Sequence, residues 1–362
     1  MATDGGSPPL SPSFKRFLWA RLLGNAALQM LLVALGWQVY ALTASAWDLG
    51  LVGLLQFLPA LALTIPAGQL IDRVDRRKVL AGAIAIQAAV AGVLAWASFG
   101  HWAARDLILG LAMAIGVSRA LQMPAQQAMI PTLVDLPELP RATALASTLM
   151  KLAVVGGPAL GGFMYAFGAD VVYGSSTLLL GASLLFILGI EPARTPPTRE
   201  PVTWSSVFAG FAFVWRHKVA LGAISLDLFA VLLGGATALL PIYAKDVLET
   251  GPWGLGLLRS APAMGALVVG AWLARHPLGS HVGRTMFVSV AIYGVAILAF
   301  GLSHWFWVSL VALAVSGGAD MVSVVIRLTL IQVETPDEMR GRVSAVNSVF
   351  IGASNELGEF RA

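Results

Sequence analysis

Long apolar runs separated by short polar segments dominate the sequence. The runs lie near residues 17–42, 48–71, 78–99, 105–127, 143–168, 170–190, 218–243, 252–274, 284–302 and 304–331, and a last one starts near 342. A membrane-spanning helix needs about 20 consecutive apolar residues, and most of these runs reach that length. The pattern therefore predicts an all-α membrane protein whose helices cross the bilayer many times.

Polar segments divide the chain into four parts. Residues 1–13 are polar and rich in Ser and Pro, without the layout of a cleavable signal, so we expect a disordered cytoplasmic tail. The stretch 191–216 contains EPARTPPTREP and has no apolar period, which is typical of a linker. We therefore expect helical bundles at 14–190 (spans 1–6) and 217–362 (spans 7–11, incomplete), joined by a cytoplasmic linker.

Composition supports the membrane interpretation and excludes several other classes. Hydrophobic residues make up 57% of the chain and charged residues 12%, whereas soluble proteins average about 25% charged residues. The chain has no Cys and five scattered His, which excludes a disulfide framework and gives no metal-ligand spacing. We expect no metal, no cofactor and no nucleic-acid partner, because the basic residues lie in short loops between apolar runs.

The distribution of Lys and Arg predicts the orientation in the membrane. With the N-terminus inside, the outer loops contain only Arg105 and Lys245, and the inner segments contain the remaining loop cations. Such an excess of positive charge is characteristic of the cytoplasmic side. The inner set consists of Lys15, Arg16, Arg21, Arg73, Arg76, Arg77, Lys78, Arg141, Arg194, Arg199, Arg216, Lys218, Arg275, Arg284, Arg340 and Arg342.

An internal repeat relates the two bundles. Residues 53–60 read GLLQFLPA and residues 256–263 read GLLRSAPA, an offset of 203 that also places Tyr40-Ala41 on Tyr243-Ala244. Parallel six-helix repeats are a common construction of transporters. If the second bundle matches the first, its natural end lies about 30 residues beyond Ala362, so we expect the chain to lack helix 12 and the end of helix 11.

The loop after the second span carries a family motif. Residues 68–80, GQLIDRVDRRKVL, resemble the loop 2–3 signature of the major facilitator superfamily, with Gly68, Asp72, Arg73, Arg76 and Arg77 at its positions. The resemblance implies a fold of two six-helix bundles, here truncated after about helix 11. It also implies a latch, in which an Asp72 and Arg73 charge pair between helix ends holds one access state. The simpler interpretation is membrane anchoring by positive charge.

A second motif lies inside the fifth span. VGGPALGG at 155–162 is similar to the family's helix-5 exporter signature, with matching residues Gly156, Gly157, Pro158, Gly161 and Gly162. Gly157 and Gly161 have Gly-xxx-Gly spacing, which allows close helix contact, and Pro158 removes one backbone hydrogen bond. The resemblance implies a seal between helix 5 and the other half, while packing alone remains open. Segments from 239 onward resemble the branch that contains the enterobactin exporter.

Ionisable residues inside spans are costly and are candidates for function. Asp227 has no obvious local cation, and burial favours the protonated form of a lone carboxylate, so it is our first candidate for a proton site. For Asp320 and Arg327 a fixed ion pair and a proton relay stay equally open. Arg119 shares a helix face with Gln122 and Gln126, and is either a structural partner or a cavity charge. The remaining candidates are Lys151 and Glu356, with Gln29, Gln38, Gln56 and Gln87 interpreted mainly as interhelical hydrogen-bonding groups.

We predict a secondary active, proton-coupled exporter that works by alternating access, a monomer in the bacterial cytoplasmic membrane. Its partners are a small-molecule substrate, protons and the lipid bilayer. The alternatives are an importer or lipid mover of the same fold, or a transport-inactive remnant or binding scaffold. A membrane enzyme is not supported, because no nucleophile-base pair, metal set or nucleotide-binding loop occurs.

Overall fold

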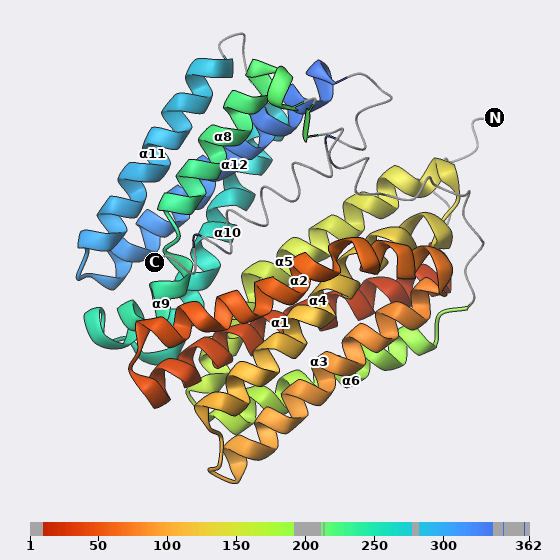
Figure 1. The fold of residues 1–362 in the computed structure, drawn as a ribbon, viewed down its shortest axis with the longest axis vertical. Coiled ribbons are helices and arrows are strands. Elements are labelled where there is room, and N and C mark those ends of the chain that lie inside the picture. The colour runs from red at the N-terminus through yellow and green to blue at the C-terminus, as the bar shows by residue number, and fades with distance from the viewer. Residues whose placement is uncertain are drawn as a thin grey trace, which may run out of the picture.

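The computed structural model describes residues 10–191, 211–212, 214–276 and 282–335, with the single positions 343 and 358. The described chain is helical throughout (Figure 1). The first half contains α1 (Pro12–Thr43), α2 (Ala46–Arg73), α3 (Arg76–Phe99), α4 (Arg105–Leu133), η1 (Leu136–Glu138), α5 (Leu139–Tyr165) and α6 (Ala169–Leu188). The second half contains α8 (Lys218–Leu233), η2 (Thr237–Leu239), α9 (Leu240–Ile242), the π-helical turn η3 (Tyr243–Val247), α10 (Gly251–Arg275), α11 (Val282–Leu302) and α12 (Phe306–Glu334).

Polar side chains mark the starts of the first three helices. The Ser11 hydroxyl accepts from the Phe14 amide at 3.1 Å, and Pro12 occupies the first helical position. Ser45 and Asp75 cap α2 and α3 in the same way. Caps satisfy amides that a helix start leaves without partners. Short polar residues between apolar runs therefore set where these spans begin.

The first half is a compact bundle. Helix α1 packs against α5 and α6, α2 packs against α4, and α3 packs against α4 and α6. The Ser183 hydroxyl of α6 donates to the Ala20 carbonyl of α1 at 2.7 Å, next to Gly24. Gly116 of α4 faces the Gln56 backbone of α2, with no room for a side chain. Small residues thus bring these helices into backbone contact, as in other membrane bundles.

The second half differs from the expectation at its first span. The sequence predicts one helix over 218–243, but the structure ends α8 at Leu233 and continues after a break through η2, α9 and η3. Gly234 and Gly235 have poor helix propensity, and Pro241 has no amide to donate. The prediction of a continuous helix was wrong, because the apolar run hides these helix breakers. The predicted last span from about 342 lies outside the described residues apart from positions 343 and 358.

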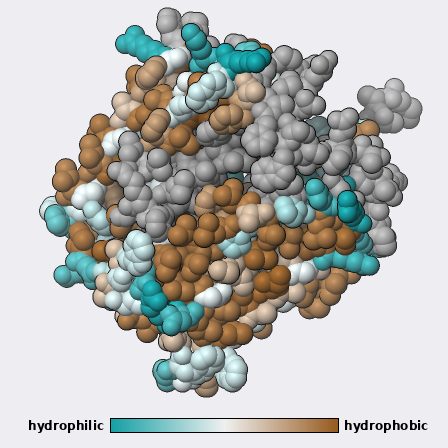
Figure 2. All heavy atoms as spheres, in the orientation of Figure 1, coloured by the Kyte–Doolittle hydropathy of each residue, from teal (hydrophilic) through white to brown (hydrophobic). Residues whose placement is uncertain are grey.

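Length and surface character fit a membrane protein. Within the described ranges, nine helices are long and apolar enough to cross a bilayer. Large apolar side chains are exposed along them, including Phe99, Leu178 and Val268 at 74%, 77% and 71%. Figure 2 shows hydrophobic atoms across the middle of the visible face and hydrophilic atoms gathered at its margins. The chain is a multi-pass membrane protein.

The two halves meet through α5 and α10. We call the end where α1 finishes and α10 begins the closed end, because Tyr40 and Gly162 of the first half contact Asp246 and Gly256 of the second there. The opposite end of the first half carries Arg16, Arg73, Arg76, Arg77 and Arg141, and we call it the basic end. Helix order places the α1, α3 and α5 starts at the basic end.

Candidate functional site

The glycines of the helix-5 motif contact two different partners. A Cβ at position 157 would lie 2.6 Å from the Gln29 Cβ, and one at 161 would lie 2.7 Å from the Met30 Cα, both on α1. A Cβ at position 162 would lie 2.7 Å from the Gly256 Cα on α10, in the other half. Gly156 faces nothing within 4 Å. The motif therefore packs α5 against α1 on one side and against α10 on the other.

A polar clasp joins the halves at the closed end. The Tyr40 hydroxyl of α1 donates to an Asp246 carboxylate oxygen of η3, and the Lys245 ammonium lies 5.2 Å from the centre of the Tyr40 ring. Tyr40 is 7% exposed, whereas Asp246 is exposed. We call Tyr40 and Asp246 the closed-end clasp. It ties the last turns of α1 to the segment that follows the break in the second half.

An apolar layer lies beneath the clasp. Val33 and Trp37 of α1 are buried in one cluster with Leu240 of α9 and Leu258 of α10. The Trp37 ring meets the Tyr165 ring edge-on, with ring centres 6.3 Å apart. Such a layer excludes water between the halves, because apolar surfaces from both are removed from solvent.

Two hydrogen bonds from α10 cross the contact deeper in the bundle. The Ser260 hydroxyl donates to the Val155 carbonyl of α5 at 2.7 Å, and Arg259 reaches the Leu32 carbonyl of α1 at 3.5 Å. Sequence reasoning missed Arg259, although the repeat offered a signal, since it stands at the repeat position of Gln56. The repeat likewise placed Tyr40 on Tyr243, but nothing in the sequence pointed to Asp246 as its partner.

At the basic end, the loop motif holds neighbouring helices. The Arg76 guanidinium donates to the Ala128 carbonyl of α4 at 3.3 Å, and Arg77 donates to the Ile190 carbonyl after α6 at 2.5 Å. Arg16 of α1 also donates to the Gly189 carbonyl. Cations at these carbonyls complement the negative helix end. Gly68 faces nothing within 4 Å and Arg73 is exposed, while the Asp72 side chain lies outside the described part.

The glutamines of α4 do not gather around Arg119, contrary to the expectation from their spacing. Arg119 donates to the Gln56 side chain of α2 at 3.3 Å. Gln122 instead accepts from Gln87 of α3 at 2.7 Å, and Gln126 accepts from Asn25 of α1 at 3.5 Å. Each side chain therefore turns toward a different helix, because spacings of three and seven residues leave an arc wide enough to meet several neighbours.

Other predicted candidates lie apart from one another. Asp320 lines a small pocket of the second half, and Arg327, two turns further along α12, is 2% exposed. Lys151 is exposed on α5. Asp227 lies on α8, but its side chain is outside the described part, as is Glu356 altogether. Across the described residues, no group of three or more His, Cys, Asp or Glu could hold a metal ion.

An ion pair that the sequence did not reveal fastens α2 to α4 at the closed end. Arg105 contacts the Asp48 carboxylate through Nη2 at 2.6 Å and Nε at 2.9 Å, and also pairs with Asp106 at 2.9 Å. Asp48 is 5% exposed. Arg105, interpreted as one of the few outer-loop cations, is thus a structural residue within the first half.

Sequence comparison finds exporters among the relatives. The profile of a family described as transmembrane secretion effector matches residues 5–359. The chain is 32% identical over 356 residues to the multidrug efflux pump Tap of Mycobacterium tuberculosis, which covers 94% of this chain and 84% of that protein. It is 26% identical over 348 residues to the enterobactin exporter EntS of Shigella dysenteriae, covering 92% of this chain and 80% of that protein.

Solved structures with the same fold are transporters. A bacterial homologue of the lysosomal transporter Spinster superposes with a TM-score of 0.70 at 14% identity, covering 98% of this chain and 82% of that one. A bacterial homologue of the iron transporter ferroportin gives 0.68 at 18% identity, covering 98% and 91%. At these identities the likeness concerns the fold alone.

Proposed function

Because this chain belongs to the transmembrane secretion effector family of the major facilitator superfamily, we propose that it is a secondary active exporter of a small molecule. The observation that carries the direction of transport is the 32% identity over 94% of the chain to a multidrug efflux pump. Similarity to an enterobactin exporter points the same way. We propose an amphiphilic, drug-like or siderophore-like substrate.

Alternating access gives the closed end its role. In this state the closed-end clasp, the apolar layer with Trp37, and the Gly162 contact with Gly256 join the halves. Export requires these contacts to separate so that substrate can leave on that side. The halves then close at the basic end, where the Asp72 and Arg73 latch would operate. Rocking of two bundles about a central site is the general mode of this fold.

Charge distribution sets the proposed orientation. The basic end faces the cytoplasm, since cytoplasmic loops are enriched in Lys and Arg. The N-terminus and the linker then lie inside, in the bacterial cytoplasmic membrane, and the closed end faces outward. Protons are the proposed driving ions, with Asp227 of α8 as the carrier, because an intramembrane carboxylate is a natural relay group.

The test is efflux from cells that lack their own pumps. Cells expressing the chain and preloaded with a fluorescent amphiphilic cation, such as ethidium, should lose it faster than vector controls, and a protonophore should abolish the difference. Asp72→Asn should slow efflux at matched membrane levels, because it removes the charge and keeps the volume. Lys78→Gln, in the same loop but outside the motif, serves as the control.

Two results would contradict the proposal. Faster accumulation of ethidium in expressing cells would indicate an importer. Efflux equal to that of the vector control, across a panel of amphiphiles of either charge, would favour a binding scaffold.

A further inference from the structure

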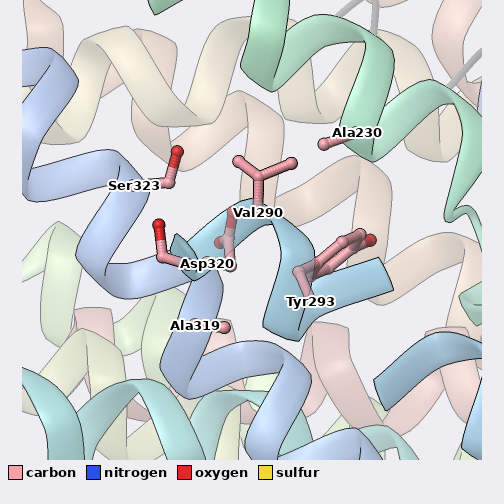
Figure 3. Close-up of a pocket in the computed structure, with 7 residues that line it drawn as sticks. Ala230, Val290, Tyr293, Ala319, Asp320 and Ser323 are labelled. Carbon is pink, nitrogen blue, oxygen red and sulfur yellow. The ribbon is translucent and has the colours of Figure 1, made fainter. Parts of the chain in front are cut away.

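A small pocket inside the second half has no part in the contacts described so far. It lies between α8, α11 and α12 and is lined by four oxygen-bearing residues, Asp320 and Ser323 of α12 and Ser289 and Tyr293 of α11, with aliphatic residues around them. Figure 3 shows the Asp320 and Ser323 side chains directed into the same space. The empty volume is about 200 Å³, below the roughly 300–1,000 Å³ of drug-sized ligand sites. The pocket suits an ion and excludes the exported molecule.

The broken end of α8 adds negative character to this pocket. Ala230, in the last turn of α8, lines the pocket, and its carbonyl accepts the amide of the capping residue Gly234 at 2.9 Å. Tyr293 donates to the Gly234 carbonyl at 3.3 Å, which fixes the broken end beside the pocket. The last carbonyl groups of a helix carry a partial negative charge. A cation in the pocket would be stabilised by this helix end.

The break is a property of the second half alone. At the repeat offset Gly234 corresponds to Leu31, and α1 runs without interruption from Pro12 to Thr43. The repeat therefore does not require a helix end at this depth. Discontinuous helices near the membrane midplane, with helix C-terminal ends and unwound carbonyls, form ion sites in other transporters.

The donor chemistry selects the class of ion. Carboxylate, hydroxyl and carbonyl oxygens are hard ligands that suit hard metal cations. The Ser289 hydroxyl already donates its hydrogen to the Met286 carbonyl at 2.8 Å, so its lone pairs remain to coordinate a cation. Asp320 supplies the single carboxylate charge among the lining residues, which balances a monovalent ion. We propose that this pocket binds a monovalent metal cation of the size of Na⁺, with Asp320, Ser323 and Ser289 as ligands.

Cation binding has a consequence for transport that, unlike the binding itself, rests on the proposed exporter function. The break separates α8, which ends at the pocket, from η3, which carries Asp246 of the closed-end clasp. One chain segment thus connects the cation pocket to the closed end. Occupancy of the pocket should bias how readily the closed end separates, as a ligand with different affinity for two states shifts their balance.

Direct binding of ²²Na⁺ to the purified protein in lipid nanodiscs tests the site. At constant pH and ionic strength, with choline replacing Na⁺, binding should saturate at one ion per chain. Asp320→Asn should abolish saturable binding. Ser323→Ala should weaken affinity roughly tenfold, the loss of one ligand. Ser316→Ala is the matched control on α12, because that hydroxyl donates to the Leu313 carbonyl at 2.8 Å and does not line the pocket.

Several outcomes would overturn the proposal. These are no saturable ²²Na⁺ binding to the wild-type protein, unchanged binding to Asp320→Asn, or an equal loss in Ser316→Ala and Ser323→Ala. Proton release on titration that depends on Asp320, without ²²Na⁺ binding, would make the pocket a proton site and reject the metal ion. If Asp320→Asn does not purify as a single species, Ser323→Ala and Asp320→Glu decide the question. Because binding is measured without transport, a failed efflux assay leaves this result intact.

Discussion

The closed-end clasp offers the sharpest test of how the two halves are held together. Tyr40→Phe keeps the ring, and with it the contact to Lys245, but removes the hydroxyl that donates to Asp246. Tyr243→Phe is a matched control, since Tyr243 occupies the repeat position of Tyr40 and donates to the Gly301 carbonyl of its own half at 2.9 Å. We expect the first change, and not the second, to favour separation of the halves.

The expected magnitude follows from the surroundings of the bond. A hydrogen bond to a charged group contributes about 1.5–3 kcal/mol when well buried. Tyr40 is buried but Asp246 is exposed to solvent, which screens and competes for the bond. About 1 kcal/mol is then a reasonable value for the clasp, and it corresponds to about a fivefold increase in the population with the closed end open.

Pulsed electron-electron double resonance can measure this population. The chain has no native Cys, so spin labels attach only at introduced ones. Leu42→Cys on α1 and Glu249→Cys after η3 are exposed positions on the two sides of the clasp. Tyr40→Phe should enlarge the long-distance component about fivefold. An unchanged distance distribution, or an equal change in Tyr243→Phe, would refute the assignment of the clasp.

Three further predictions concern the interface, the coupling ion and the orientation. Gly162→Ala should reduce efflux at least tenfold, because the new Cβ would collide with Gly256, whereas Gly156→Ala should leave efflux within twofold, since its Cβ meets open space. Asp227→Asn should abolish efflux driven by a proton gradient and retain substrate binding, measured in everted vesicles and by equilibrium binding. Ser11→Cys should resist an impermeant thiol reagent in intact cells and react once the membrane is permeabilised.

Each of these has a contrary result. Equal efflux from the alanine variants at 162 and 156 would show that the α5–α10 contact is not required. Normal pH-dependent accumulation by Asp227→Asn would remove Asp227 from coupling. Rapid labelling of Ser11→Cys in intact cells would reverse the orientation.

The sequence alone determined the membrane class, most helix positions and the family. Apolar runs of bilayer length specify spanning helices whatever their neighbours, because lipid requires backbone groups to be satisfied within each helix. Caps such as Ser11 and Asp75 are also local, and the helices begin beside them. The motifs at 68–77 and 155–162 gave the superfamily, which the profile match over 5–359 confirmed.

Local pattern failed where apolar composition concealed a backbone constraint. Gly234, Gly235 and Pro241 lie within a run long enough to span, yet the helix ends at Leu233. Hydropathy measures the cost of burying side chains and is insensitive to where backbone hydrogen bonding stops. The Tyr293 hydrogen bond to the Gly234 carbonyl, which comes from another helix, helps hold that end in place.

Only the tertiary structure decided which polar groups meet. Spacing put Arg119 on one face with Gln122 and Gln126, but α2 supplied its partner, and α3 and α1 took the two glutamines. The repeat matched Tyr40 with Tyr243, but only Tyr40 crosses to the other half. A helix face is a local property of the chain. The partner of each side chain depends on how separate helices approach, and contacts more than a hundred residues apart in sequence leave no trace in local spacing.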